Sequence, residues 1–289
     1  MNYELLKNEP MSKHTTFKTG GSAEDFYRVL SIDGLLEVLN ITSKNGVKPL
    51  IIGNGSNLLV SDMGPGVPVI EIGEGVSDIK VDGDIIEAEA GARLSKVSRC
   101  ALEHSLTGME FASGIPGTIG GALYMNAGAY GGEMKDVVQS VKAFKDGEII
   151  EIAGEDMDFG YRHSRAMEDD MILLSAVLKL KPGDKQEIED LMNDLNQRRR
   201  DKQPLEYPSA GSTFKRPEGY FAGKLIMDAG LAGESFGGAM VSPKHCGFVI
   251  NTGGATSTDV YALIKKVQSV VYDKFGVKLE TEVKLIGEF

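Results

Sequence analysis

The sequence contains few cysteines, no excess of basic residues and no long apolar run. Cys100 and Cys246 are the only cysteines in 289 residues, and two cysteines form neither a disulfide framework nor a zinc site. No stretch approaches the roughly 18 consecutive apolar residues that a membrane-spanning helix needs. Asp and Glu number 42 against 31 Lys and Arg, and the net charge of −11 argues against a general nucleic-acid or membrane-surface binder.

The first ten residues, MNYELLKNEP, also lack the basic segment and the apolar run of a signal peptide. Together with the low cysteine content, this favours a protein of the reducing cytoplasm. We therefore expect a cytoplasmic protein with no nucleic-acid partner, no membrane partner, no metal site and no obligate protein partner.

Two common nucleotide-binding motifs are missing. The run Gly53-Asn54-Gly55-Ser56-Asn57 resembles the start of a G-x-G-x-x-G fingerprint, but Leu58 stands where the third glycine belongs. A strand, not a helix, is expected after this run, which excludes an ordinary Rossmann turn. No G-x-x-x-x-G-K-[ST] occurs, so a P-loop ATPase is excluded as well. A glycine turn of this kind can still form an anion-binding nest, although a hairpin turn without a ligand is the simpler interpretation of this run alone.

The remaining pattern is that of a globular α+β protein long enough for two domains, with 42% hydrophobic and 25% charged residues. Apolar periodicity predicts helices over 32–45, 92–105, 184–200 and 258–275. Apolar runs predict strands within 47–53, 57–62, 171–180, 242–251 and 278–286. Asp-Gly pairs predict hairpins over 78–90 and 141–152. The Pro- and Gly-rich run 201–219 is the predicted domain boundary.

A second loop is far richer in glycine. Residues 114–132, GIPGTIGGALYMNAGAYGG, contain seven glycines and few side chains that could serve as an acid or a base. Glycine lets the backbone approach a ligand closely, and so many glycines would be unusual in a purely structural loop. Together with the turn at 53–57, this stretch suits a dinucleotide with a diphosphate and a flat ring system, which is FAD.

Five motifs then occur in a fixed order: IIGNGSNLLVSD, FASGIPGTIGGALYMNAGAYGGE, GYRHS, AGSTFKRP and LETEV. In this combination the chain closely resembles the family of UDP-N-acetylenolpyruvoylglucosamine reductases, flavoenzymes of bacterial peptidoglycan synthesis. The resemblance implies an α+β fold, with a two-subdomain FAD-binding fold of the vanillyl-alcohol oxidase type and a small C-terminal α+β substrate domain. The FAD-binding region would span 1–200, with subdomains of about 1–75 and 76–200, and the substrate-binding domain would span 201–289.

The resemblance also implies the ligands. FAD would bind non-covalently, NADPH would reduce it and leave, and UDP-N-acetylglucosamine enolpyruvate would take the place of NADPH. The expected FAD-binding residues come from the two glycine-rich stretches: Gly53, Asn54, Gly55, Ser56, Asn57, Gly117, Gly120, Gly121, Ala122, Asn126 and Gly128.

Three catalytic residues follow from the motifs. Arg162 of GYRHS would bind the substrate carboxylate and stabilise the developing enolate, and Ser212 of AGSTF would deliver the proton. Glu282 of LETEV would polarise the enolpyruvyl group. Strand alternation alone places Glu282 on a solvated face with Glu280 and Lys284, so its role rests on the resemblance.

Substrate contacts are expected at Tyr161, at the cations Lys202, Lys215 and Arg216, which suit a diphosphate, and at His245. The sequence departs from the family pattern at Cys246-Gly247, where a small residue and then Asn are expected, and it lacks the extra tyrosine-bearing loop of the longer branch. It therefore resembles the shorter branch. Two alternatives stay open, a flavin-dependent oxidase of the same superfamily and a non-catalytic nucleotide-binding protein.

Overall fold

A computed structural model describes residues 2–289, and the chain folds into two compact units. Unit 1 consists of Met1–Leu5, Tyr27–Asn54 and Ile70–Arg199, and unit 2 consists of Leu6–Phe26, Gly55–Val69 and Arg200–Phe289. Unit 2 thus takes two segments from the N-terminal quarter of the chain. The functional division into an FAD-binding region over 1–200 and a substrate-binding domain over 201–289 stays a prediction.

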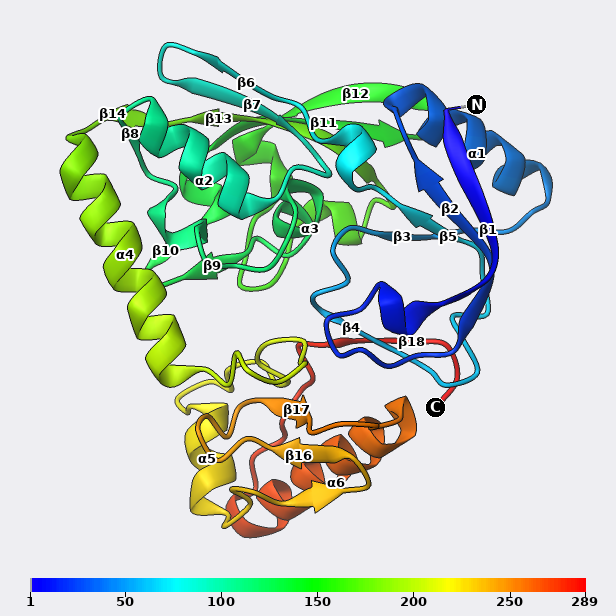
Figure 1. The fold of residues 1–289 in the computed structure, drawn as a ribbon, viewed down its shortest axis with the longest axis vertical. Coiled ribbons are helices and arrows are strands. Elements are labelled where there is room, and N and C mark those ends of the chain that lie inside the picture. The colour runs from blue at the N-terminus through cyan, green and yellow to red at the C-terminus, as the bar shows by residue number, and fades with distance from the viewer. Residues whose placement is uncertain (1) are drawn as a thin grey trace. The chain divides into compact units, whose positions relative to one another are not determined.

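The largest sheet of unit 1 has five antiparallel strands in the order β12-β11-β13-β7-β6 (Figure 1). Its strands are β6 (Ile79–Asp82), β7 (Ile85–Glu89), β11 (Val138–Lys145), β12 (Glu148–Ala153) and β13 (Ile172–Lys179). Both predicted Asp-Gly hairpins are confirmed. Lys145 pairs with Glu148 across a two-residue turn in which Asp146 and Gly147 both have positive φ, as a type I′ turn requires.

One face of this sheet is covered by α2 (Leu94–Glu103) and α3 (Ile119–Tyr124), which bury an apolar core together with it. A long helix, α4 (Lys185–Lys202), follows, and the carboxylate of Asp184 accepts the backbone N–H groups of Gln186 and Glu187 at its start. Short strand pairs complete this part: β8 (Leu106–Thr107) with β14 (Lys181–Pro182), and β9 (Gly128–Ala129) with β10 (Gly132–Glu133).

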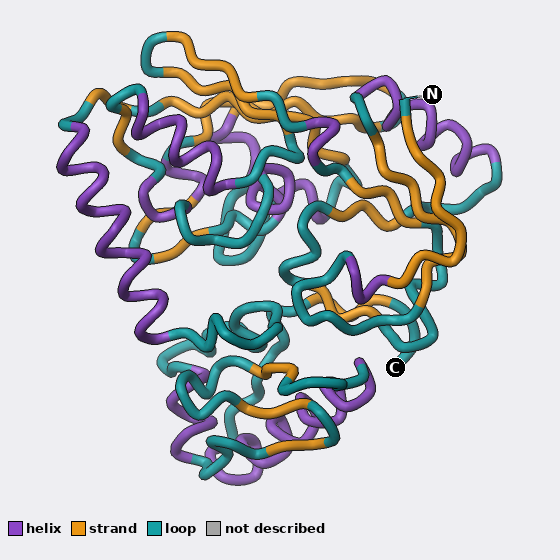
Figure 2. The backbone as a smooth tube through the Cα atoms, in the orientation of Figure 1, coloured by secondary structure: helices purple, strands orange, loops and turns teal. Residues whose placement is uncertain are grey.

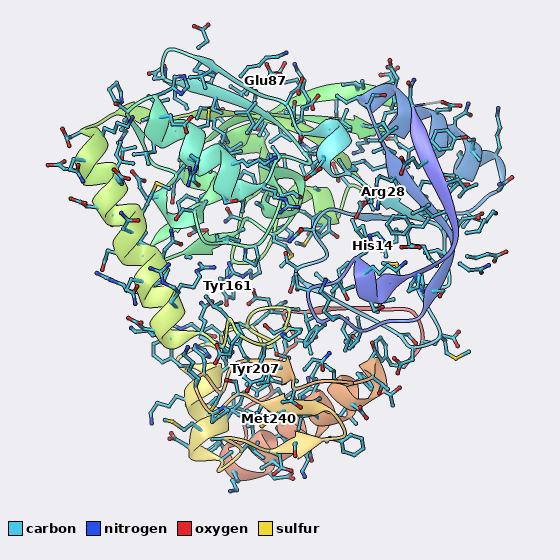
Figure 3. All side chains as sticks on the ribbon, in the orientation of Figure 1. His14, Arg28, Glu87, Tyr161, Tyr207 and Met240 are labelled. Atoms are coloured by element: carbon cyan, nitrogen blue, oxygen red, sulfur yellow. The ribbon has the colours of Figure 1, made fainter. Side chains whose placement is uncertain are left out.

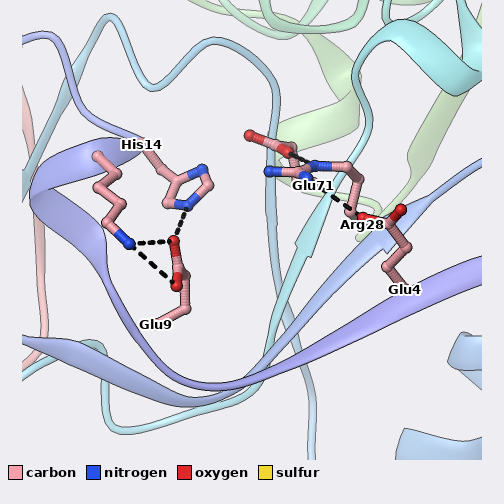
Figure 4. A network of polar contacts seen from close by, with 6 residues as sticks. Glu4, Glu9, His14, Arg28 and Glu71 are labelled. Carbon is pink, nitrogen blue, oxygen red and sulfur yellow. Dashed lines mark hydrogen bonds and ion pairs between the residues drawn. The ribbon is translucent and has the colours of Figure 1, made fainter.

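A second core of unit 1 lies under α1 (Ile32–Lys44), whose first turn is capped by the Ser31 hydroxyl at 3.1 Å from the Gly34 nitrogen. Beside it, Arg28 forms ion pairs with Glu4 at 3.2 Å and with Glu71 at 2.9 Å (Figure 4). A four-stranded sheet has the order β1-β2-β5-β3, with β1 (Tyr3–Pro10), β2 (Ser22–Val29), β5 (Val69–Glu71) and β3 (Leu50–Ile52).

Unit 2 contains a three-stranded sheet, β15 (Ser235–Phe236), β16 (Ala239–Val241) and β17 (Val249–Asn251), together with α5 (Ala222–Asp228) and α6 (Ser257–Phe275). The helix predicted over 258–275 is confirmed, and it begins with a reciprocal capping box between Thr256 and Asp259. The Asp62 carboxylate adds two more bonds, to the backbone nitrogens of Ser257 and Thr258, each at 2.8 Å. Strand β4 (Leu58–Val60) pairs in parallel with β18 (Lys284–Ile286).

The strand predicted over 278–286 is therefore wrong for its first half. Only Lys284–Ile286 forms a strand, and Thr281 contributes a single isolated bridge to Phe214. Much of the chain between α4 and β16 is loop as well (Figure 2). The described part of the chain also contains six short 3₁₀ helices: Met11–Lys13, Glu74–Val76, Glu110–Ala112, Met134–Asp136, Gly154–Met157 and Arg165–Met167. Within residues 2–289, no helix combines the length and the apolarity needed to cross a bilayer.

Candidate functional site

Within unit 1, the start of the first glycine-rich turn, Gly53-Asn54, lies against the second glycine-rich loop. The side-chain amide of Asn54 donates to the carbonyl oxygen of Pro116 at 2.9 Å. A Cβ atom at Gly53 would lie only 2.3 Å from the Thr118 hydroxyl, so any other residue would have to displace Thr118. Glycine at position 53 therefore joins the turn after β3 to the loop that precedes α3.

The joined loops present backbone donors that the protein itself does not use. The N–H groups of Asn54, Thr118 and Gly121 have no acceptor among the residues that the structure describes. In contrast, the Gly120 nitrogen donates to the Ala90 carbonyl at 2.8 Å. Unpaired N–H groups on adjacent loops form a concave donor set that suits a phosphate or diphosphate.

Neighbouring glycines of the loop serve different purposes. A Cβ at Gly120 would lie 3.0 Å from the Ala90 side chain, so this glycine is packed tightly within the protein. A Cβ at Gly121 would meet nothing closer than the Thr118 hydroxyl at 3.8 Å. A Cβ at Gly128 would lie 2.7 Å from the Gly132 carbonyl oxygen. Of these three expected cofactor positions, Gly121 alone could carry a Cβ without a close contact.

Two further expected cofactor positions are occupied by protein contacts. Ala122 is buried in the core of unit 1. Asn126 is also buried, and its side-chain nitrogen donates to Glu133 at 2.6 Å and to the Gly160 carbonyl at 3.0 Å. The Asn126 side-chain oxygen accepts from the backbone nitrogen of Lys135 at 3.0 Å. The side chain of Asn126 therefore joins the glycine-rich segment to the turn that carries Arg162.

Arg162 lies in a tight turn between Gly160 and His163, whose N–H and C=O groups are paired in both directions at 3.1 and 3.3 Å. Its φ of +55° is left-handed, a conformation that costs a residue other than glycine about 1 kcal/mol or more. Tyr161 is 57% exposed (Figure 3), and the Arg162 guanidinium lies 5.3 Å from its ring centroid. After the turn, the buried Ser164 hydroxyl donates to the Tyr124 carbonyl at the end of α3, at 2.8 Å.

Ser212 and Glu282 are brought together in unit 2 by backbone pairing. The backbone nitrogen of Glu282 donates to the carbonyl of Thr213, the residue that follows Ser212, at 2.8 Å. Thr213 is in turn fixed by its own nitrogen, which donates to the Gly247 carbonyl, and by its hydroxyl, which accepts from the Val249 nitrogen at 2.9 Å. Ser212 and Glu282 are both half-buried.

Asn57 joins this arrangement from the end of the first glycine turn. Its side-chain nitrogen donates to the Glu282 carbonyl at 3.2 Å, and its carbonyl accepts from the Lys284 nitrogen at 2.9 Å. Just before it, Gly55 has φ of +57°, and a Cβ there would lie 1.9 Å from the His14 carbonyl oxygen. His14 is itself hydrogen-bonded to Glu9 at 3.1 Å (Figure 4). Its ring also packs on Phe26, with the ring centroids 4.1 Å apart. Sequence reasoning missed His14 and Thr118, because neither contact is visible in local spacing.

The expected substrate cations differ in their surroundings. Lys202 is exposed at the end of α4, and Lys215 pairs with Glu280 at 3.2 Å. Arg216 stacks over Phe221, with its guanidinium 4.0 Å from the ring centroid. His245 is half-buried, its ring nitrogen accepts from the Gly247 nitrogen at 3.2 Å, and burial lowers its pKa. His245 is therefore neutral at pH 7.

The chain matches two protein-family models. Residues 26–153 match the FAD binding domain, and residues 203–286 match the C-terminal domain of UDP-N-acetylenolpyruvoylglucosamine reductase. UDP-N-acetylenolpyruvoylglucosamine reductase of Caldanaerobacter subterraneus subsp. tengcongensis is 51% identical over 286 residues, which cover 99% of this chain and 94% of that protein. The chain belongs to the UDP-N-acetylenolpyruvoylglucosamine reductase family.

Other members agree over the same extent. The reductase of Clostridioides difficile is 50% identical over 99% of this chain and 94% of its own length. The crystal structure of the reductase from Thermus caldophilus superposes with a TM-score of 0.85 at 34% identity, covering 99% of this chain and 100% of that chain. The predicted family and the predicted α+β fold with an FAD-binding domain are confirmed. The individual site residues remain predictions.

We expect Gly121→Pro to weaken FAD binding by 10-fold or more, because it removes an N–H that would bond a charged oxygen, a bond worth about 1.5–3 kcal/mol. Proline is tolerated in a first helical turn, so the apoprotein should still fold. Gly121→Ala keeps the N–H and is the matched control, with near-normal FAD affinity. Titration of the apoprotein with FAD, followed by flavin fluorescence, measures both. Equal affinity of the two variants would show that this N–H does not contact FAD.

The depressed pKa of His245 predicts a pH-dependent stability. Unfolded His245 takes up a proton near pH 6.5, whereas the folded residue does so only at lower pH, so the free energy of unfolding should fall as pH drops from 7 to 5. In His245→Gln the free energy of unfolding should lack the share of this decrease, between pH 7 and pH 5, that comes from protonation of His245. Thermal unfolding at pH 7 and pH 5 compares the two proteins, and an identical fall in both would contradict the assignment.

Proposed function

We propose that this protein is an FAD-dependent reductase that uses NADPH to convert UDP-N-acetylglucosamine enolpyruvate into UDP-N-acetylmuramate for peptidoglycan synthesis. The observation that carries the proposal is identity of about one half with reductases of this family over almost the whole chain. Two free cysteines, Cys100 and Cys246, fit the reducing cytoplasm in which we place the protein.

FAD would be held by the joined loops of unit 1. The unpaired N–H groups of Asn54, Thr118 and Gly121 fit its diphosphate, and the absence of a side chain at Gly121 leaves room for close approach. The continuing turn through Gly55 and Ser56 to Asn57 would add short polar donors. When bound, FAD supplies hydride transfer from NADPH to the enolpyruvyl methylene carbon.

Arg162 would bind the substrate carboxylate. Hydride addition to the methylene carbon leaves negative charge on the adjacent carbon, and this charge spreads into the carboxylate. A planar guanidinium can donate two parallel hydrogen bonds to a carboxylate and stabilise that charge. Hydrogen bonds to Asn126 and to the Tyr124 carbonyl hold the two sides of the paired turn. Arg162 would therefore already be in position, and little reorganisation would be needed during the reaction.

Ser212 would deliver a proton to the carbon that becomes negative, and Glu282 would polarise the enolpyruvyl group. Hydride and proton together saturate the double bond and leave a lactyl ether. The bonds from Thr213 to Gly247, Val249 and Glu282 support this proposal, because they fix the backbone next to both side chains. Lys202, Lys215 and Arg216, with Tyr161 and His245, would contact the sugar nucleotide, and Lys215 would then exchange its exposed ion pair with Glu280.

Anaerobic spectroscopy of the FAD-loaded protein tests the function. NADPH should bleach the flavin absorbance, and UDP-N-acetylglucosamine enolpyruvate should restore it with formation of UDP-N-acetylmuramate. Restoration by oxygen alone would instead indicate an oxidase. A protein that binds no FAD would indicate a nucleotide-binding protein without this chemistry.

Ser212→Ala should separate the two half-reactions. We expect normal FAD binding and normal reduction by NADPH, but turnover lower by about 10²–10⁴-fold, the usual contribution of a general acid. Ser209→Ala, in the same loop, is the control and should turn over normally. Stopped-flow measurement of flavin reduction and reoxidation resolves the steps. Near-normal reoxidation in Ser212→Ala would remove Ser212 from the proton-transfer step.

A further inference from the structure

Arg199 is a buried cation at the end of α4. Its side chain is only 9% exposed, and one guanidinium nitrogen donates to the Gly114 carbonyl at 2.6 Å. The guanidinium also lies 5.9 Å from the centroid of the Tyr130 ring. Arg199 therefore contacts the first residue of the glycine-rich segment 114–132 and a residue near its end.

The charge of Arg199 has no acidic partner. Among residues 2–289, no Asp or Glu forms an ion pair with it, whereas the adjacent Arg198 pairs with Asp194 at 2.7 Å. Burial lowers the pKa of Arg199, with only Tyr130 acting in the opposite direction. Removing a cation from water without an opposite charge is unfavourable, and such groups in proteins are normally paired or bound to a ligand.

The Arg199 guanidinium has five N–H donors. Its hydrogen bonds to the Gly114 carbonyl and to the Tyr130 hydroxyl use only some of them. The partner that would balance the charge is an oxyanion, a phosphate or a carboxylate, because these accept two parallel bonds from one guanidinium. The proposed FAD site already offers the diphosphate the N–H groups of Asn54, Thr118 and Gly121. The uncompensated cation is thus left for an anion that arrives with another nucleotide.

We propose that Arg199 binds an oxyanion of the nucleotides that alternate at the flavin, NADPH and the sugar nucleotide. This inference rests on the proposed function, which supplies both ligands. It makes Arg199 a binding residue, distinct from Arg162 in the Gly160–His163 turn. The neighbouring Gly114 would be glycine because a Cβ there would lie 2.4 Å from Asn196 and 3.1 Å from Arg199, so α4 can bring the guanidinium close to the loop backbone.

The test uses FAD-loaded protein and two ligands that bind without turnover, NADP⁺ and UDP-N-acetylmuramate, titrated by perturbation of the flavin spectrum. Arg199→Met removes the charge at similar side-chain length, Arg199→Lys keeps the charge without the fork, and Arg198→Met is the matched control. We expect Arg199→Met to raise the Kd of at least one of these ligands 10-fold or more, and Arg199→Lys to raise it less. Arg198→Met should leave both Kd values within about 2-fold.

Stability and FAD affinity separate this role from a structural one. Because the cation lacks a carboxylate, Arg199→Met should leave the thermal midpoint of the apoprotein unchanged or raised. Its Kd for FAD should also be unchanged. A lowered midpoint with unchanged ligand binding, a loss confined to FAD, or unchanged Kd values for both ligands would each overturn the inference. Failure of the wild type to bind either ligand would overturn the proposed function instead.

Discussion

The close approach of two loops is the constraint on which the proposed cofactor site depends. Gly53 can lie against Thr118 only because it has no side chain, and the Asn54 amide then fastens the two loops at Pro116. Once joined, the loops point backbone N–H groups away from protein acceptors. A phosphate bound there needs no charged side chain, since several N–H groups already offer partial positive charge. A segment with few reactive side chains can therefore serve a flavoenzyme.

The glycine-rich segment 114–132 also positions a residue with a reactive side chain, Arg162. Asn126 and the carbonyl of Tyr124 bond to either side of the turn that contains Arg162, so the last residue of α3 and the segment just after it fix the strained backbone of this arginine. In unit 2 the equivalent task falls to Thr213 and Asn57, which bond to the backbone of Glu282 on both sides of its peptide. In both units, main-chain carbonyls and buried polar side chains hold the expected catalytic residues. Such bonds are costly to break when buried, which favours a fixed geometry.

Local patterns predicted the parts of the fold that local forces decide. The Asp-Gly hairpin at Asp146-Gly147 and the helix over 258–275 follow from turn chemistry, capping and periodicity within a few residues. The separate purposes of Gly120 and Gly121 could not be predicted, because Ala90 lies thirty positions away in the sequence and decides between them. The alternation around Glu282 indicated a strand, yet bonds to Thr213, about seventy positions away, keep this part of the chain out of a regular sheet. Motif resemblance supplied the family, and contacts between distant segments supplied the reasons for its glycines.

Amide hydrogen exchange can show whether the unpaired N–H groups of the joined loops receive the cofactor. Exchange of single amides, measured in apoprotein and in FAD-loaded protein, distinguishes donors that are free from donors already bonded. We expect FAD to slow exchange at Asn54, Thr118 and Gly121, while Gly120, bonded to Ala90 in the protein itself, changes far less. Unchanged exchange at those three amides, with FAD fully bound, would contradict it.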